Sequence, residues 1–268
     1  MALALADRWV LVTGASSGLG RALAIELAER HRACLVLTAR RRDRLEELAR
    51  GLDPRGTRTA VVPVDLARPG GVDALFAAAP PHTLEAAALA AAGHSFGPFA
   101  ALDPEQIHAL LALNVHAPVA IARRLLPVFD ARASGGLLFV ASTGGYMPTP
   151  QQAVYGGTKA FLINFVRSLY FERGGADDPV HLTLVCPGGM PTEMLEGTAI
   201  GELLARRPIV SRLLMEPERV ARLALAALLD KTPELVPGLA NRAMLAYAKL
   251  LPLGLLGRGA ARIYDPKR

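Results

Sequence analysis

Cysteine is nearly absent from this sequence, and its scarcity excludes a fold held together by disulfides. Only Cys34 and Cys186 occur in 268 residues, and both lie within apolar runs. The six histidines show neither an HExxH pattern nor another paired metal-binding spacing. We therefore expect two buried free thiols, no metal centre and a reducing, cytoplasmic compartment.

Long uninterrupted apolar runs are also lacking. Residues 1–12 contain the charged pair Asp7-Arg8 and no small-residue cleavage site, so a signal peptide is not expected. No stretch of about 18 uncharged apolar residues occurs, which argues against a membrane-spanning helix. The net charge is +6, but the basic residues are scattered and form no stripe with aromatic side chains. We therefore expect no nucleic-acid partner.

Short apolar runs alternate with longer helical patterns through most of the chain. Hydrophobic residues make up 51% and charged residues 20%, which is typical of a globular protein. Strands that are apolar on both faces and separated by helices indicate a parallel sheet covered on both sides. We therefore predict one α/β domain over residues 1–268, a doubly wound, Rossmann-like parallel sheet with helices on both faces. The predicted strands are Trp9–Thr13, Cys34–Thr38, Ala60–Val64, Ala86–Ala90, Leu137–Ala141, His181–Val185 and a weaker Glu234–Val236.

A helix is predicted to begin at Pro104 and to run towards Phe129. Asp103 can cap its first turn, and proline is favoured at the first helical position. Pro118 and Pro127 are expected to bend or end this helix, because an internal proline lacks the N–H that the helix needs.

A glycine-rich turn follows the first predicted strand and leads into a helix. It reads Gly14-Ala-Ser-Ser-Gly18-Leu-Gly20, one residue longer than the usual Gly-x-Gly-x-x-Gly spacing. Glycines allow close approach of the backbone to a pyrophosphate, and the following helix N-terminus offers free N–H groups. Packing alone can also place glycines in such a turn, but the strand–turn–helix context favours a dinucleotide site.

The end of the second predicted strand favours NADP(H) over NAD(H). An NAD site has a carboxylate there for the ribose 2′-hydroxyl, whereas this chain has Arg40 and Arg41. Arginine binds a phosphate through paired N–H groups. The alternative is a solvated helix start, although cations at a helix N-terminus oppose the helix dipole.

Tyr155 and Lys159 lie four residues apart on a predicted helix running to about Phe171. They therefore share a helix face, and the ammonium group can lower the pKa of a phenol that is otherwise about 10. The pair alone is a common pattern. Ser142, thirteen positions before Tyr155, and Asn114 within a predicted helix make it more specific.

Taken in this order, the motifs resemble the short-chain dehydrogenase/reductase family, in the branch with a Tyr-x-x-x-Lys active site. The resemblance extends from Asp7 to Thr192. It implies that Tyr155 is the general acid/base, that Ser142 hydrogen-bonds the substrate oxygen and that Lys159 binds the nicotinamide ribose. It also implies that Asn114 holds a water molecule linking Lys159 to solvent.

The same resemblance supplies cofactor positions. Asp65 matches the residue that contacts adenine, and the Pro187–Thr192 turn matches the segment that holds the nicotinamide carboxamide. The sequence departs from the family pattern at two places. The usual Asn-Asn-Ala-Gly reads Ala90-Ala91-Ala92-Gly93 here, and the loss of the two amides implies weaker local hydrogen bonding. Ser17 stands where many NADP-preferring members carry a cation. The expected cofactor contacts are Gly14, Ser16, Ser17, Gly18, Leu19, Gly20, Arg40, Arg41, Asp65, Leu66, Ala92, Gly93, Tyr155, Lys159, Pro187, Gly188 and Thr192.

The expected activity is NADP(H)-dependent interconversion of a carbonyl and an alcohol. Residues 193–216 contain a strongly apolar set beside Arg206 and Arg207 and match the family's substrate lid, with ordinary helix packing as the alternative. Tyr146, Met147 and Pro148 add apolar character. These features favour a hydrophobic ketone, aldehyde or secondary alcohol. A catalytically idle NADP-binding sensor or scaffold is the alternative from another class, and epimerase, dehydratase or lyase chemistry on the same fold is a further one.

The C-terminal stretch at 239–268 is rich in leucine and basic residues. A basic amphipathic helix can lie on an anionic membrane surface, cover the pocket or pack against a second subunit. The family resemblance implies a homodimer or homotetramer.

Overall fold

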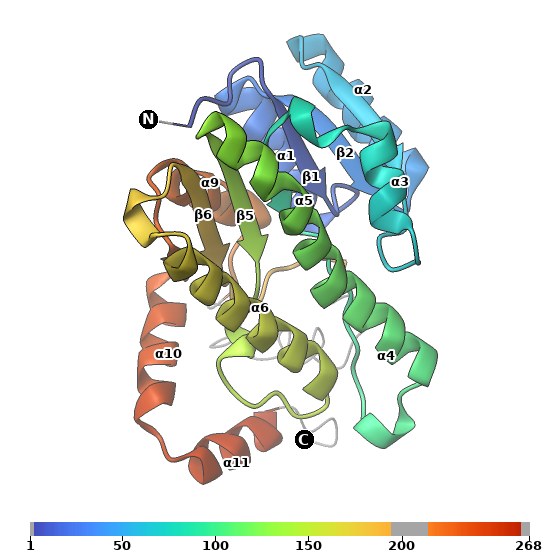
Figure 1. The fold of residues 1–268 in the computed structure, drawn as a ribbon. Helices are drawn as coiled ribbons and strands as arrows, with labels where there is room; N and C mark the ends of the chain where they lie inside the picture. Colours follow the sequence, from blue (N-terminus) through green and yellow to red (C-terminus); the bar gives the residue numbers. More distant parts are fainter. Residues whose placement is uncertain (1–2, 194–213, 264–268) are drawn as a thin grey trace.

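Seven parallel strands form one sheet in the order β3-β2-β1-β4-β5-β6-β7 (Figure 1). The computed structural model describes residues 3–193 and 214–263. The predicted fold class is confirmed, and each observed strand lies within two residues of its predicted bounds. The strands are β1 (Trp9–Thr13), β2 (Cys34–Ala39), β3 (Thr59–Pro63), β4 (Leu84–Leu89), β5 (Gly135–Val140), β6 (Val180–Val185) and β7 (Glu234–Leu235).

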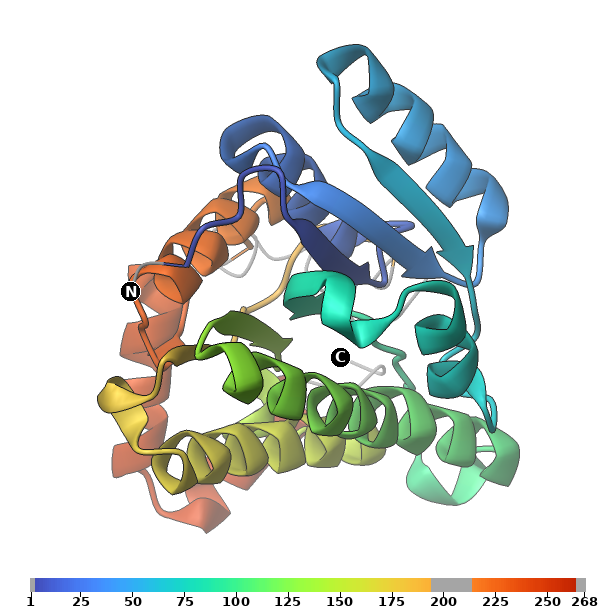
Figure 2. The same ribbon diagram turned by 45° about the horizontal axis from the view of Figure 1, so that its top comes forward.

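Helices cover both faces of the sheet (Figure 2). Each face has its own apolar core. On one face, Leu23, Leu45 and Val220 bring α1, α2 and α9 against the strands. On the other, Phe76 and Phe129 do the same for α3 and α5, beside α6. Burial on both faces explains why the strands are continuously apolar rather than alternating. The helices are α1 (Gly18–His31), α2 (Arg42–Leu52), α3 (Gly71–Ala78), α4 (Pro104–Leu111), α5 (Ala117–Arg132), α6 (Ala153–Glu172), α9 (Pro217–Leu229), α10 (Leu239–Leu250) and α11 (Leu253–Ile263).

The strand order reverses between β1 and β4, which are neighbours in the sheet. From β1 the chain first moves outward to β2 and β3, and then returns to β4 on the other side. In sheets of this kind the connecting loops diverge at the reversal and leave a crevice at the carboxyl ends of the strands. The loops that follow Thr13 and Leu89 therefore frame the expected binding site.

The helix that begins at Pro104 runs on to Arg132, further than expected, and neither proline ends it. A π-helical turn at Ala112–His116 joins α4 to α5 without a break. Pro118 lies in the first turn of α5, directly after this wider turn, where the regular hydrogen-bond ladder is already interrupted. Pro127 lies inside α5. The helix therefore ends at neither proline, and the bend expected as the alternative stays a prediction.

The same helix, Pro104–Arg132, is the one candidate for a membrane span among the described residues, judged by length and hydropathy alone. Its apolar side packs on the sheet through Ile121, Leu125 and Phe129, which are buried. The core helix of a globular protein passes the same test, so the helix is accounted for by the fold.

The C-terminal helices α10 and α11 lie beyond the carboxyl ends of β5 and β6 (Figure 1). They form the described part of the extension expected at 239–268. The expected lid at 193–216 falls almost entirely outside the described residues, apart from Glu193 and residues 214–216.

Candidate active site

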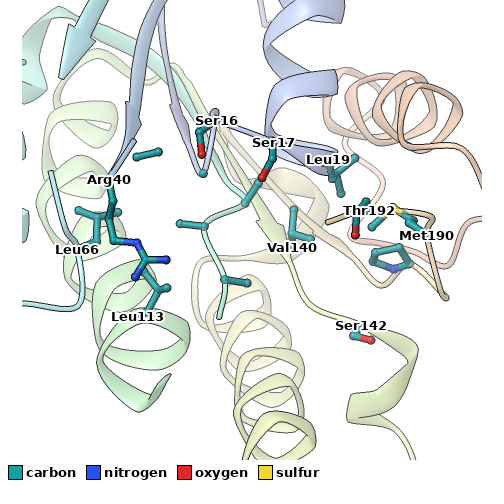
Figure 3. A pocket seen from close by; sticks show the side chains of 18 of the residues that line it. Ser16, Ser17, Leu19, Arg40, Leu66, Leu113, Val140, Ser142, Met190 and Thr192 are labelled. Carbon is teal, nitrogen blue, oxygen red and sulfur yellow. The ribbon is translucent and has the colours of Figure 1, made fainter. Parts of the chain in front are cut away.

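A single pocket at the carboxyl edge of the sheet contains nearly all the predicted cofactor contacts (Figure 3). Of the predicted cofactor contacts only Gly93 is not part of its described lining, and the predicted catalytic residue Asn114 is not part of it either. Ser142, Tyr155 and Lys159 line the same pocket as the glycine turn. The residues not foreseen from the sequence are all apolar, and most of them follow or end a strand: Ala39, Val64, Ala90, Ala91, Leu113, Val140, Ala141 and Met190.

The glycine turn is shaped so that side chains cannot replace two of its glycines. Gly14 has φ +71°, and a Cβ atom there would lie 2.8 Å from Ala91 Cα. A Cβ atom on Gly20 would lie 2.2 Å from the Gly14 carbonyl oxygen. The first turn of α1 contains no acidic residue, and the Ser17 side chain does not cap it. The free N–H groups and the positive dipole end of this helix suit a diphosphate. The glycine turn and the start of α1 therefore fit a dinucleotide.

Two arginines stand at the end of β2 beside this turn. Figure 3 shows Arg40 reaching across one side of the pocket towards Leu66 and Leu113. The Arg41 guanidinium donates to Ser16 Oγ at 3.2 Å, so it is held against the glycine turn. Asp65 Oδ1 accepts from the Ala67 N–H at 3.0 Å, which orders the loop after β3. A cationic edge therefore lies at one end of the pocket.

Lys159 is a buried cation inside the pocket wall. Lys159 is only 2% exposed, and its Nζ donates to the Val140 carbonyl oxygen at 3.0 Å. Burial lowers the pKa of Lys159 to about 8. No ion pair with a carboxylate neutralises it in the described part of the chain, and Nζ lies 5.7 Å from the centre of the Tyr155 ring. The ammonium group therefore lies over the Tyr155 ring in the wall of the pocket.

Ser142 stands at the end of β5, opposite the start of α6. Its Oγ accepts from the Gly144 N–H at 3.1 Å, which holds the short turn that follows. The same turn is tied to the loop after β6, because the Thr143 N–H donates to the Pro187 carbonyl oxygen at 2.9 Å. Figure 3 shows Ser142 on the same side of the pocket as Met190 and Thr192. Arg40 and Ser142 thus mark opposite ends of one elongated pocket.

Asn114 ties the loop after β4 to the helix that carries Tyr155. Its amide accepts from the Gly93 N–H at 2.8 Å and donates to the Gly93 carbonyl oxygen at 3.1 Å. It also donates to Thr158 Oγ1 at 3.1 Å, and that hydroxyl donates to the Tyr155 carbonyl oxygen. The π-helical turn places Asn114 at this junction. The water relay expected of Asn114 stays a prediction.

The loop after β4 keeps backbone support although its usual amides are replaced by alanines. The Ala91 N–H donates to Thr13 Oγ1 at 3.0 Å, and Asn114 holds both polar groups of Gly93. A hydroxyl on β1 and an amide on the neighbouring helix thus anchor the loop.

His94 is a site neighbour that the sequence did not single out. Its ring packs edge-on against Tyr155 with 4.8 Å between ring centres, and Nε2 lies 3.0 Å from Gln152 Oε1. Burial lowers the pKa of His94, which favours the neutral ring at pH 7. Its position directly after Gly93 was the one signal that could have revealed it.

Tyr146 is more polar in its contacts than expected. Its hydroxyl donates to Glu234, and the guanidinium of Arg167 both pairs with Glu234 at 2.6 Å and lies over the Tyr146 ring. Burial raises the pKa of Tyr146. Tyr146, which was expected to add apolar character near the site, therefore also makes polar contacts there.

The sheet order, the glycine turn and the pocket define a Rossmann-like nucleotide-binding protein. A family model described as short chain dehydrogenase matches residues 8–202. The chain belongs to the short-chain dehydrogenase/reductase family and is an oxidoreductase of that family.

Individual relatives agree with this assignment. An uncharacterized oxidoreductase of Staphylococcus epidermidis is 31% identical over 198 residues, which cover 73% of this chain and 84% of the relative. The 11-beta-hydroxysteroid dehydrogenase 1A of Arabidopsis thaliana is 32% identical over 205 residues, 74% of this chain and 57% of that protein. A short-chain dehydrogenase from Sphingobium yanoikuyae, solved in complex with NADPH, has a TM-score of 0.76 at 27% identity and covers 90% of this chain and 93% of its own.

Proposed function

We propose that this protein is an NADP(H)-dependent oxidoreductase that interconverts a carbonyl and an alcohol, with Tyr155 as general acid/base. The observation that carries the proposal is the buried Lys159 cation, directed at Tyr155 within the pocket that the glycine turn lines. A buried, charged group without a neutralising carboxylate is costly, and such groups cluster at functional sites.

The chain's own residues account for the proton transfer. The Lys159 charge favours the phenolate and lowers the pKa of Tyr155, so that the phenol can exchange a proton near neutral pH. Ser142 at the facing strand end would donate to the substrate oxygen as negative charge develops on it. The cofactor, when bound, supplies or accepts the hydride at the carbonyl carbon. Pro187, Gly188 and Thr192 would hold its nicotinamide end, and the glycine turn its diphosphate.

Arg40 and Arg41 support a preference for NADP(H). They place two cations at the end of β2, where the ribose 2′-phosphate of NADP would lie. The NADPH complex of the Sphingobium relative is consistent with this cofactor. For the substrate, the apolar wall that includes Met190 supports a lipophilic carbonyl, and the hydroxysteroid dehydrogenase from Arabidopsis is a relative named for such a substrate.

The test of the proposed function is oxidation of NADPH and NADH against a panel of lipophilic and polar carbonyls. We expect faster turnover with NADPH and with lipophilic carbonyls. Arg40→Gln should raise KM for NADPH about tenfold or more, because a charge-assisted contact to the phosphate is lost, and should change KM for NADH little. Binding of NADPH with no turnover of any carbonyl would instead favour the idle sensor or scaffold.

We further propose that α10 and α11 contact an anionic membrane surface. Leu239, Tyr247 and Leu250 form an exposed stripe along α10 that is 64–81% exposed, and Leu253 continues it at 72%. Residues 239–263 contain four basic residues and no acidic one. Apolar side chains flanked by cations suit anionic lipid headgroups, whereas two copies of this face would bring like charges together.

Vesicle co-sedimentation tests this surface. The protein should bind vesicles containing anionic phosphatidylserine, bind neutral phosphatidylcholine vesicles far less, and be released by high salt. Replacing Leu250 and Leu253 by serine should weaken binding about tenfold or more, because two large apolar contacts are lost. The matched control replaces Phe171, which is exposed on α6. Equal binding by both variants, or self-association through this face, would overturn the proposal.

The remaining expectations are proposals of the same kind. We propose a homodimer or homotetramer, to be tested by measuring the mass in solution, and a reducing, cytoplasmic compartment. The buried free thiols Cys34 and Cys186 are compatible with that compartment.

A further inference from the structure

Glu193 occupies the cationic edge of the pocket from the opposite side of the glycine turn. One oxygen of its carboxylate accepts from the Arg41 guanidinium at 2.7 Å, and the other lies 3.6 Å from Arg44. The residues come from segments 152 positions apart in the sequence. The hydrogen bond from Arg41 also holds the pKa of Glu193 below its usual range, so the carboxylate is charged at neutral pH.

The backbone holds Glu193 in this place. Thr192, its neighbour, lies directly against the glycine turn: a Cβ atom on Gly18 would be 3.2 Å from Thr192 Cγ2. The chain therefore crosses beside Gly18 before Glu193 reaches Arg41. The same guanidinium donates with its other nitrogen to Ser16 Oγ. The Arg41 guanidinium thus donates both to Ser16 in the glycine turn and to the Glu193 carboxylate, which follows Thr192 on the other side of that turn.

We infer that Glu193 competes with the cofactor's 2′-phosphate for Arg41 and thereby sets how strongly the enzyme prefers NADP(H) over NAD(H). This inference rests on the proposed function, because it requires the 2′-phosphate to bind at the end of β2. A carboxylate and a phosphate both seek the paired N–H groups of a guanidinium. An N–H group already donated to Glu193 must exchange its partner before it can bind a phosphate.

The competition acts on one cofactor only. NAD(H) has a free 2′-hydroxyl and no anion to place against Arg41, so displacing Glu193 brings it no gain. NADP(H) must displace or share Glu193 and receives the Arg41 contact in exchange. Selectivity is a difference between two affinities, and a charge that opposes one ligand alone changes that difference directly.

The test measures binding of 2′,5′-ADP and 5′-AMP to the full-length protein by calorimetry. These two probes carry the adenosine end with and without the 2′-phosphate, and neither undergoes reaction. Glu193→Gln keeps the size of the side chain and removes its charge. It should lower Kd for 2′,5′-ADP about threefold to fivefold, the scale of a partly exposed ion pair, and leave Kd for 5′-AMP unchanged.

The matched control is Glu46→Gln. Glu46 is a half-exposed carboxylate on α2 that pairs with Arg42 at 3.4 Å, so its removal changes the charge near the arginines equally without freeing Arg41. In an Arg41→Gln background, Glu193→Gln should have no effect on Kd for 2′,5′-ADP. Circular dichroism melting of each variant shows that the fold is intact.

The outcomes separate the inference from the proposed function. If wild-type protein binds 2′,5′-ADP no more tightly than 5′-AMP, the NADP(H) preference itself fails. If it does bind 2′,5′-ADP more tightly but Glu193→Gln matches Glu46→Gln, general electrostatics explain the change and the inference is overturned. Weaker binding by Glu193→Gln also overturns it, because Glu193 would then orient Arg41 for the phosphate.

Discussion

Tyr155→Phe is expected to reduce turnover at least about 10²-fold while NADPH binding is retained. The substitution removes only the phenolic hydroxyl, so the ring keeps its edge-on contact with His94 and the pocket keeps its shape. A positioned acid/base contributes about 10² to 10⁴ in rate, and no other described group takes that place beside Lys159. Turnover is measured by NADPH oxidation with the best carbonyl of the panel, and NADPH binding by its fluorescence.

The matched control for this variant is Tyr170→Phe on the same helix. Tyr170 lies fifteen residues further along α6 and packs against Phe171, away from the pocket. It should keep normal turnover. Near-normal activity in Tyr155→Phe would exclude Tyr155 as the proton donor, and a loss of NADPH binding would assign the effect to the cofactor site.

Lys159→Met is expected to lose at least about 10²-fold in kcat/KM at pH 7 without destabilising the fold. In the proposed mechanism the ammonium charge favours the Tyr155 phenolate, so its removal makes the phenol a weaker acid. In the direction of alcohol oxidation, the rise of kcat/KM with pH should therefore move upward relative to wild type. A variant that loses activity with an unchanged pH profile would show that Lys159 serves only to bind the cofactor.

The stability of Lys159→Met follows from the sign of the pKa shift. Burial lowers the pKa of Lys159 from 10.5 to about 8, so the charged side chain opposes folding by about 3 kcal/mol at pH values below 8. This cost fades as pH rises from about 8 to 10.5, where wild-type stability should increase. Methionine removes the cost but leaves the Val140 carbonyl oxygen unpaired, which costs about 1–3 kcal/mol. Thermal melting at pH 7 should show an equal or higher Tm, with the advantage shrinking above pH 8.

The sheet could be predicted from the sequence because each strand is apolar on both faces and is separated from the next by a helical pattern. The site then followed from topology: Arg40, Asp65 and Ser142 come within two residues of the ends of predicted strands, and parallel strands bring their carboxyl ends to one edge. The helix was expected to bend or end at its prolines and ends at neither, because no sequence pattern predicts the π-helical turn beside Pro118.

Contacts between distant segments could not be predicted in the same way. The pairing of Glu193 with Arg41 and the packing of His94 on Tyr155 depend on side-chain directions that no local pattern encodes. Asn114 was singled out in the sequence because an asparagine is unfavourable inside a helix. Its partners, Gly93 and Thr158, became known only from the fold.

The contact between Gly188 and α10 bears on the order in which the pocket is completed during synthesis. A Cβ atom on Gly188 would lie 2.5 Å from Asn241 Oδ1, so α10 presses directly on the loop after β6. Asn241 is itself buried and donates to the Pro237 carbonyl oxygen at 2.9 Å. Chains are synthesised from the N-terminus, and a domain generally folds as a unit. The glycine turn, Ser142, Tyr155 and Lys159 are all synthesised before Asn241, so this one domain can complete its pocket only after α10 has left the ribosome.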